Sequence, residues 1–109
     1  MSTKFVIRPK ADKDLDDHAF YLAIEAGPEL GHRFLFAAHE TFSLLAAQPE
    51  MGWKPRLRHP KLSQVKIFRV SGFEKILVLY IPRPGGIEIL RVVHGSRNLL
   101  AFLRREGLS

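Results

Sequence analysis

The chain of 109 residues contains no cysteine. This absence excludes disulfide bonds, thiol catalysis and every zinc site that uses cysteine ligands. The chain also lacks an uncharged apolar run near the roughly 18 residues that a membrane-spanning helix needs. The first nine residues, MSTKFVIRP, have too short an apolar core for a signal peptide. These absences predict a cytoplasmic protein that does not contact a membrane, with a single domain over residues 1–109.

Patterns that bind metals or cofactors are missing as well. The run of acids over residues 12–17 lacks the glycine at the sixth position and the glutamate at the twelfth position of a calcium loop. Gly85 and Gly86 are followed by neither a helix start nor the Lys-Ser/Thr of a phosphate-binding loop. The five histidines contain no His-x-x-x-His pair; they are His18, His32, His39, His59 and His94. We therefore expect no metal and no cofactor.

Acidic residues are scarce in the second part of the chain. Residues 1–50 contain five basic and eight acidic residues, a net charge of −3. Residues 51–109 contain twelve basic and three acidic residues, a net charge of +9. Such an uneven distribution suits a phosphate-bearing ligand or an acidic partner protein. Composition alone does not distinguish these partners from a basic surface that only maintains solubility.

Hydrophobic periodicity and turn residues predict an α+β fold with the order β-α-α-β-β-β and a short C-terminal helix. A helical hairpin is expected to pack on one face of a mainly antiparallel sheet, which leaves the opposite face or an edge of the sheet for a partner. The predicted strands cover residues 3–8, 64–70, 75–83 and 87–94, and the predicted helices cover 10–26, 28–47 and 98–105. Acids in the first turns of the helix over 10–26 complement its dipole.

Residues 89–98 (ILRVVHGSRN) hold the densest group of candidate functional residues. Regular alternation would place Leu90, Val92 and His94 on one face of the strand, with Arg91 and Val93 on the other. Basic residues of the preceding loop and strand are expected to extend this group into a concave basic surface. The predicted binding residues for a target or partner are Arg56, Arg58, Lys61, Lys66, Arg69, Arg91 and Arg97.

Two interpretations of this group remain open. In a nuclease, His94 would move a proton while Arg91 and Arg97 stabilise the charge on a phosphate, so these three are the catalytic candidates. Alternatively, His94 is a hydrogen-bonded structural residue, and Arg91 pairs with Glu88 or with a carboxylate of a helix. Three aromatic residues offer stacking surfaces for bases but are more typical of a core, where we place Tyr80; the other two are Trp53 and Phe73.

Three segments together resemble the RelE/ParE superfamily of bacterial type II toxins, and its ParE-like (plasmid stabilisation) branch in particular. The segments are Arg8–Leu15 (RPKADKDL), Ala46–Gly52 (AAQPEMG) and Ile87–Asn98 (IEILRVVHGSRN). The last segment is similar to the Ile-x-Ile-x-x-Val-x-His-x-x-Arg-Asp ending of the family. The resemblance covers nearly the whole chain and implies the element order predicted above.

The resemblance implies a toxin that a cognate, ParD-like antitoxin holds inactive. In the family, the C-terminal segment of the antitoxin folds across the toxin beside its sheet, which leaves a higher-order toxin–antitoxin complex of this chain as an open expectation. ParE-like members inhibit DNA gyrase without a catalytic centre, whereas RelE-like members are ribosome-dependent endoribonucleases that use lysine, arginine and often a tyrosine or histidine near the C-terminus. The only tyrosines here are Tyr21 and Tyr80. Lys66 stands where ParE-like proteins commonly have arginine, and Asn98 stands where aspartate is usual. The resemblance favours gyrase inhibition, with mRNA cleavage as the alternative.

Overall fold

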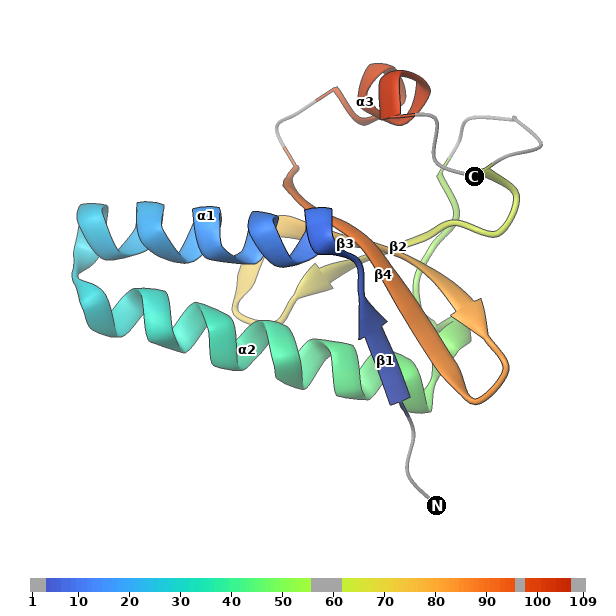
Figure 1. Ribbon diagram of the computed structural model, residues 1–109, viewed down its shortest axis with the longest axis horizontal. Helices are drawn as coiled ribbons and strands as arrows, with labels where there is room; N and C mark the ends of the chain where they lie inside the picture. The colour runs from blue at the N-terminus through green and yellow to red at the C-terminus, as the bar shows by residue number, and fades with distance from the viewer. Residues whose placement is uncertain (1–3, 56–61, 96–97, 107–109) are drawn as a thin grey trace.

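The computed structural model describes residues 4–55, 62–95 and 98–106. Along this part of the chain, one strand and two long helices precede three consecutive strands and a short terminal helix (Figure 1). The elements are β1 (Lys4–Ile7), α1 (Pro9–Ala26), α2 (Pro28–Ala47), the 3-10 turn η1 (Pro49–Met51), β2 (Lys66–Val70), β3 (Phe73–Arg83), β4 (Gly86–His94) and α3 (Leu99–Glu106). This order confirms the predicted α+β class, the helical hairpin and the short C-terminal helix.

The four strands form one sheet in the order β1-β4-β3-β2. Tight turns make β2, β3 and β4 antiparallel neighbours, and Gly72 and Gly85 occupy those turns with φ of +79° and +81°. β1 joins the sheet parallel to β4, which is possible because the helical hairpin, β2 and β3 all lie between them in the chain. Gly86 permits this pairing, since a Cβ there would overlap the carbonyl oxygen of Lys4.

The helical hairpin covers one face of the sheet. Its α2 stripe of Phe34, Ala38, Phe42 and Leu45 is completely buried, at a spacing that keeps these side chains on one side of the helix. The two helices approach closely at Gly31, where a Cβ would lie 2.7 Å from a backbone oxygen of α1. Burying this stripe against the strands is the main favourable contribution of the hairpin to folding.

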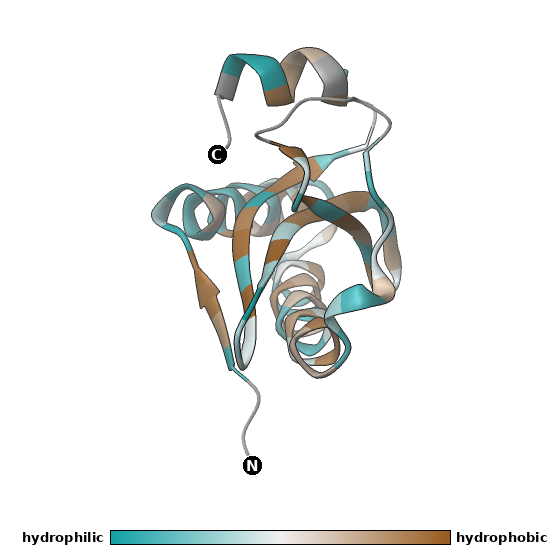
Figure 2. Ribbon diagram, turned by 90° about the vertical axis from the view of Figure 1, so that its right-hand side faces the viewer, coloured by the Kyte–Doolittle hydropathy of each residue, from teal (hydrophilic) through white to brown (hydrophobic). Residues whose placement is uncertain are grey.

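The opposite face of the sheet is covered by α3 and by the residues that precede β2. Phe102 and Leu103 of α3 are 1% and 2% exposed, and they pack with Leu62 and Val65 on the outward side chains of the central strands. Figure 2 shows hydrophobic residues along these strands, between the hairpin and α3. The expectation that this face is left for a partner is therefore wrong where α3 lies, because α3 buries its own apolar side there.

A β-bulge interrupts the alternation of β4. Leu79 pairs with Arg91 and Tyr80 pairs with Ile89, so Leu90 has no partner on β3. As a result Leu90 packs on the α3 side of the sheet while Val92 packs on the hairpin side. The prediction that Leu90 and Val92 share a face is wrong, because it assumed a regular strand.

Candidate functional site

Arg91 lies at the bulge and connects three elements of the fold. Its guanidinium donates from Nε and Nη2 to the two carboxylate oxygens of Asp14 on α1, at 2.7 and 2.9 Å. Asp14 also accepts a hydrogen bond from the backbone N–H of Val92 at 2.9 Å. On its other side the guanidinium stands 5.0 Å from the ring centre of Phe102 on α3. The interpretation of Arg91 as the partner of a helix carboxylate is thus the one that the contacts support.

Both members of this ion pair are largely withdrawn from solvent, with side chains 15% and 13% exposed. A bidentate pair in such a position has its donors and acceptors matched by geometry. From β4, Arg91 therefore contacts both α1 and α3. This use of the residue is structural.

Lys66 is largely buried and pairs with an exposed carboxylate of the same chain. Its side chain is 11% exposed, and its ammonium lies 3.2 Å from a carboxylate oxygen of Glu50 in η1. η1 is held against the sheet by Tyr80, whose hydroxyl donates to the carbonyl of Pro49 at 2.8 Å and accepts from the N–H of Gly52 at 2.9 Å. Burial raises the pKa of the Tyr80 hydroxyl. The prediction that Tyr80 is a core residue is confirmed, since it is 0% exposed.

Arg69, by contrast, is on the surface. Its guanidinium carbon stands 4.9 Å from the ring centre of Trp53, which is itself 40% exposed. Trp53 is positioned by two backbone hydrogen bonds with Ile67 on the outer edge of β2, at 2.9 and 2.8 Å. The pair presents a cation and an aromatic face together, which suits both proteins and nucleic acids as partners.

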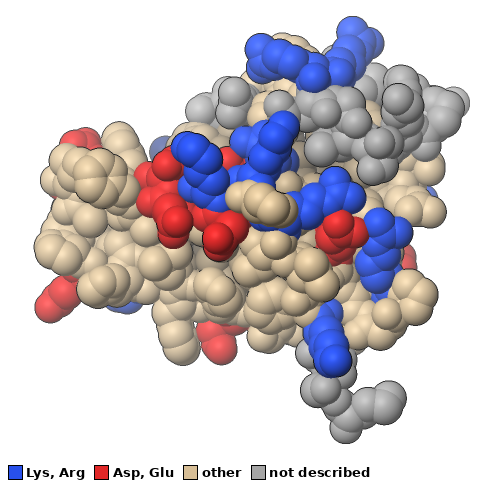
Figure 3. All heavy atoms as spheres, in the orientation of Figure 1, with Lys and Arg blue, Asp and Glu red and all other residues tan. Residues whose placement is uncertain are grey.

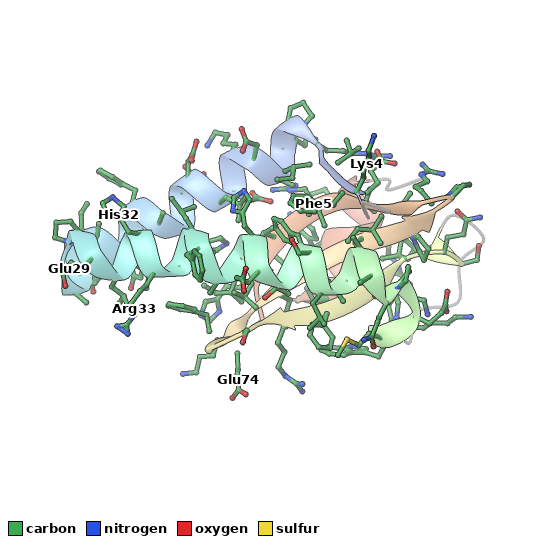
Figure 4. The ribbon with its side chains drawn as sticks, turned by 90° about the horizontal axis from the view of Figure 1, so that it is seen from below. Lys4, Phe5, Glu29, His32, Arg33 and Glu74 are labelled. Atoms are coloured by element: carbon green, nitrogen blue, oxygen red, sulfur yellow. The ribbon has the colours of Figure 1, made fainter. Side chains whose placement is uncertain are left out.

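His94 is exposed at the end of β4, between two open hollows. One hollow, of about 310 Å³, also contains the side chains of His18, Tyr21, Leu22, Phe73, Glu74, Lys75 and Ile76. The other, of about 460 Å³, is lined by Trp53, Arg69, Glu74, Lys75, Leu77, His94 and Gly95. Glu74, Lys75 and His94 belong to both hollows, and we call these three residues the rim. Figure 4 shows Glu74 of the rim pointing away from α2.

The backbone fixes the rim, because the N–H of Gly95 donates to the carbonyl of Lys75 at 2.6 Å. The hollows on both sides have mixed linings of aromatic, aliphatic and charged residues. Such surfaces bind side chains of a partner more readily than they support a reaction, which needs reactive groups in a defined mutual geometry.

The structure therefore brings together only some of the predicted residues. Arg69 and His94 share a hollow, whereas Arg91 and Lys66 are engaged in ion pairs within the fold. Arg56, Arg58, Lys61 and Arg97 lie outside the described residues, so their binding or catalytic roles stay predictions. Sequence reasoning missed Tyr21, Glu74 and Lys75. Tyr21 lies three residues after His18. This spacing places the two side chains on the same face of a helix, which was the signal that could have identified Tyr21.

Two further findings concern metal ions and membranes. Across residues 4–55, 62–95 and 98–106, no group of three or more His, Asp or Glu side chains is placed to hold a metal ion. Within the same ranges, every helix is too short or too polar to cross a membrane.

Comparisons with known proteins agree with one another. Residues 5–99 match the family model described as the ParE toxin of the type II toxin–antitoxin system parDE. The fold is similar to a solved chain described as a chromosomal ParDE TA system from P. aeruginosa, with a TM-score of 0.68 and 18% sequence identity over 84% of this chain and 95% of that one. No curated protein sequence provides a further match. On the strength of the family match, which spans most of its length, the chain belongs to the ParE toxin family of type II toxin–antitoxin systems.

Proposed function

We propose that this chain inhibits DNA gyrase by binding to it, in the cytoplasm, and that a cognate antitoxin neutralises it. The observation that supports binding over catalysis is the position of Arg91. A nuclease would need this cation to stabilise a phosphate, but its guanidinium is engaged by both oxygens of Asp14 and lies over Phe102. Breaking that pair would cost stability, so the charge is poorly suited to a reaction at the surface.

The proposed contact surface is the rim together with Arg69 and Trp53. These residues combine exposed charges with an aromatic face, and arginine and tryptophan are the types that contribute most to protein interfaces. Antitoxin binding is supported by the family and by the basic second part of the chain, which complements an acidic partner.

The test is the supercoiling of relaxed plasmid by purified gyrase with increasing amounts of the chain. We expect loss of supercoiling or accumulation of cleaved DNA, and recovery when the antitoxin encoded beside the toxin gene is added. Arg69→Glu should weaken inhibition, while Arg33→Glu, a matched change on the exposed side of α2, should not. Unchanged gyrase activity at a large excess of the chain would overturn gyrase as the target.

A second function, ribosome-dependent cleavage of mRNA, is favoured by one observation. His94 lines the same hollow as Lys75, Arg69 and Trp53, which offers an imidazole beside cations and a stacking surface for a base. The chain added to translating ribosomes would then cut mRNA at codon positions, and His94→Ala would abolish the cuts. Intact mRNA in that assay removes this function.

A further inference from the structure

The helical hairpin extends beyond the sheet at the end where α1 joins α2 (Figures 1 and 4). The last two turns of α1 carry Phe20, Tyr21 and Ile24, which are 68%, 63% and 66% exposed. Phe20 and Ile24 are four residues apart and therefore lie on the same face of the helix. Large apolar side chains that gather on an exposed surface are typical of an interaction site.

The charge at this end of the hairpin is negative. Residues 14–32 contain five acidic residues and no lysine or arginine. Glu25 lies in the last turn of α1 and Glu29 in the first turn of α2, and both are exposed. None of the ion pairs within the described part of the chain includes either glutamate. Figure 3 shows this end of the hairpin almost free of lysine and arginine, which gather nearer the sheet and on α3.

The position of Glu25 is not explained by the stability of α1. The C-terminus of a helix carries a partial negative charge and is stabilised by lysine or arginine, but α1 has no basic residue in its last turn. Its dipole therefore repels Glu25, and the exposed rings of Phe20 and Tyr21 add nothing to the core. Residues that break the local rules of stability are expected where a surface serves to bind.

These five residues form one surface, which we call the tip; they are Phe20, Tyr21, Ile24, Glu25 and Glu29. The tip adjoins the rim, because Tyr21 lines the hollow of about 310 Å³ together with Glu74, Lys75 and His94. A partner that contacts the rim can therefore reach the tip across this hollow.

We propose that the tip docks on a basic and apolar face of gyrase. Apolar side chains of gyrase cover Phe20 and Ile24, and its lysine or arginine side chains pair with the two glutamates. This inference rests on gyrase inhibition as proposed above and adds a second contact to the rim. Charge complementarity supports it, since an enzyme that binds DNA carries basic surfaces, which an acidic tip complements.

The charge of the tip argues against three other occupants. DNA would bring its phosphates against Glu25 and Glu29. The antitoxin is expected to be acidic where it complements the basic second part of the chain, so the tip would repel it. A second copy in a twofold contact would bring two acidic tips together. Like charges that face each other across an interface oppose association.

The first test is titration calorimetry of the chain with purified gyrase. Glu25→Lys should weaken binding by about tenfold, because a basic residue would then meet the basic face of gyrase. Its thermal midpoint should not fall, since lysine suits the C-terminus of α1. The matched control is Asp12→Lys, an exposed charge reversal about 20 Å away along the same helix, which should leave the affinity unaltered.

Phe20→Ser tests the apolar part of the tip. Because the side chain is 68% exposed, its loss should leave the thermal midpoint nearly unchanged while weakening gyrase binding by about tenfold. The control is Val6→Ser on β1, where the side chain is 62% exposed, and this variant should bind gyrase normally. Unaltered affinity for the antitoxin encoded beside the gene confirms that each tip variant is folded.

The outcomes distinguish this inference from the proposed function. Normal gyrase binding by either tip variant overturns the docking of the tip and leaves gyrase as the target. If the unaltered chain does not bind gyrase, the proposed function is overturned and the inference with it. Weaker antitoxin binding by folded tip variants identifies the antitoxin as the occupant and overturns the inference. Self-association of the chain that Phe20→Ser removes identifies a second copy, with the same consequence.

Discussion

Arg91 and Arg69 belong to the same sheet but have opposite surroundings. Arg91 is held by both oxygens of Asp14 and lies between α1 and α3. Arg69 lies at the surface over the half-exposed ring of Trp53. The first residue contributes to the fold, because two layers meet at its guanidinium. The second can contact a partner without disturbing any layer. Net charge therefore overstates the surface available for binding, since part of it is neutralised inside the fold.

The largest effect on stability is expected from Arg91→Ala. This change leaves the carboxylate of Asp14 without its bidentate partner in a site that is 13% exposed, and it should lower the free energy of unfolding by about 3 kcal/mol. Urea denaturation measures it. The matched control is Lys13→Ala, which removes the exposed pair of Lys13 with Asp17 and should leave the denaturation midpoint unaltered. Equal midpoints for the two variants would contradict a structural role for Arg91.

Tyr80→Phe should have the next largest effect. It removes only the hydroxyl that holds η1, leaving the carbonyl of Pro49 and the N–H of Gly52 without their partner. A buried donor or acceptor that loses its hydrogen bond costs about 2 kcal/mol. The thermal midpoint measures the loss, and Tyr21→Phe on exposed α1 is the control. If both variants have the same thermal midpoint, η1 does not depend on the hydroxyl of Tyr80.

Glu88 is intermediate between the buried ion pair of Arg91 and the surface residue Arg69, because its side chain is 19% exposed. Hydrogen bonds from Arg8, and then from Arg83, lower the pKa of its carboxyl from the ordinary 4.5. Its contribution to stability is therefore complete above pH 4.5 and is lost as the pH falls through the lower pKa of the folded state.

Glu88→Gln should thus lower the free energy of unfolding at pH 7 by about 1 kcal/mol, with the difference from the natural chain shrinking in acid. Urea denaturation between pH 7 and pH 3 measures both parts. A difference that stays constant over this range would mean that the charge of Glu88 does not stabilise the fold.

The smallest effect on stability is expected from Arg69→Ala, at most about 0.5 kcal/mol, because an exposed cation over an aromatic ring contributes little to folding. Its effect on binding should be larger, with about tenfold weaker affinity for gyrase or the antitoxin in titration calorimetry. A variant that binds both proteins normally would show that the contact surface lies elsewhere, and the contrast between Arg69 and Arg91 would lose its functional meaning.

Much of the fold could be predicted because its signals are local. The α2 stripe repeats at helical spacing, Gly27 and Pro28 separate the helices, and Gly85 marks the turn between the last two strands. The candidate site was predicted less completely. Arg69 and His94 were identified, but the rim also contains Lys75 and Glu74, which are brought beside His94 by the antiparallel pairing of β3 and β4.

The sequence by itself determined the element types, their order, the two-helix cover of one sheet face and the membership of the family. Only the tertiary structure decided that Leu90 bulges, that Arg91 meets Asp14 across 77 residues of chain, and that α3 closes the second face. The physical reason is the separation along the chain of the residues that interact. Helices and turns follow from interactions between residues a few positions apart, whereas strand register, ion pairing and the docking of α3 depend on which distant surfaces fit when the layers pack.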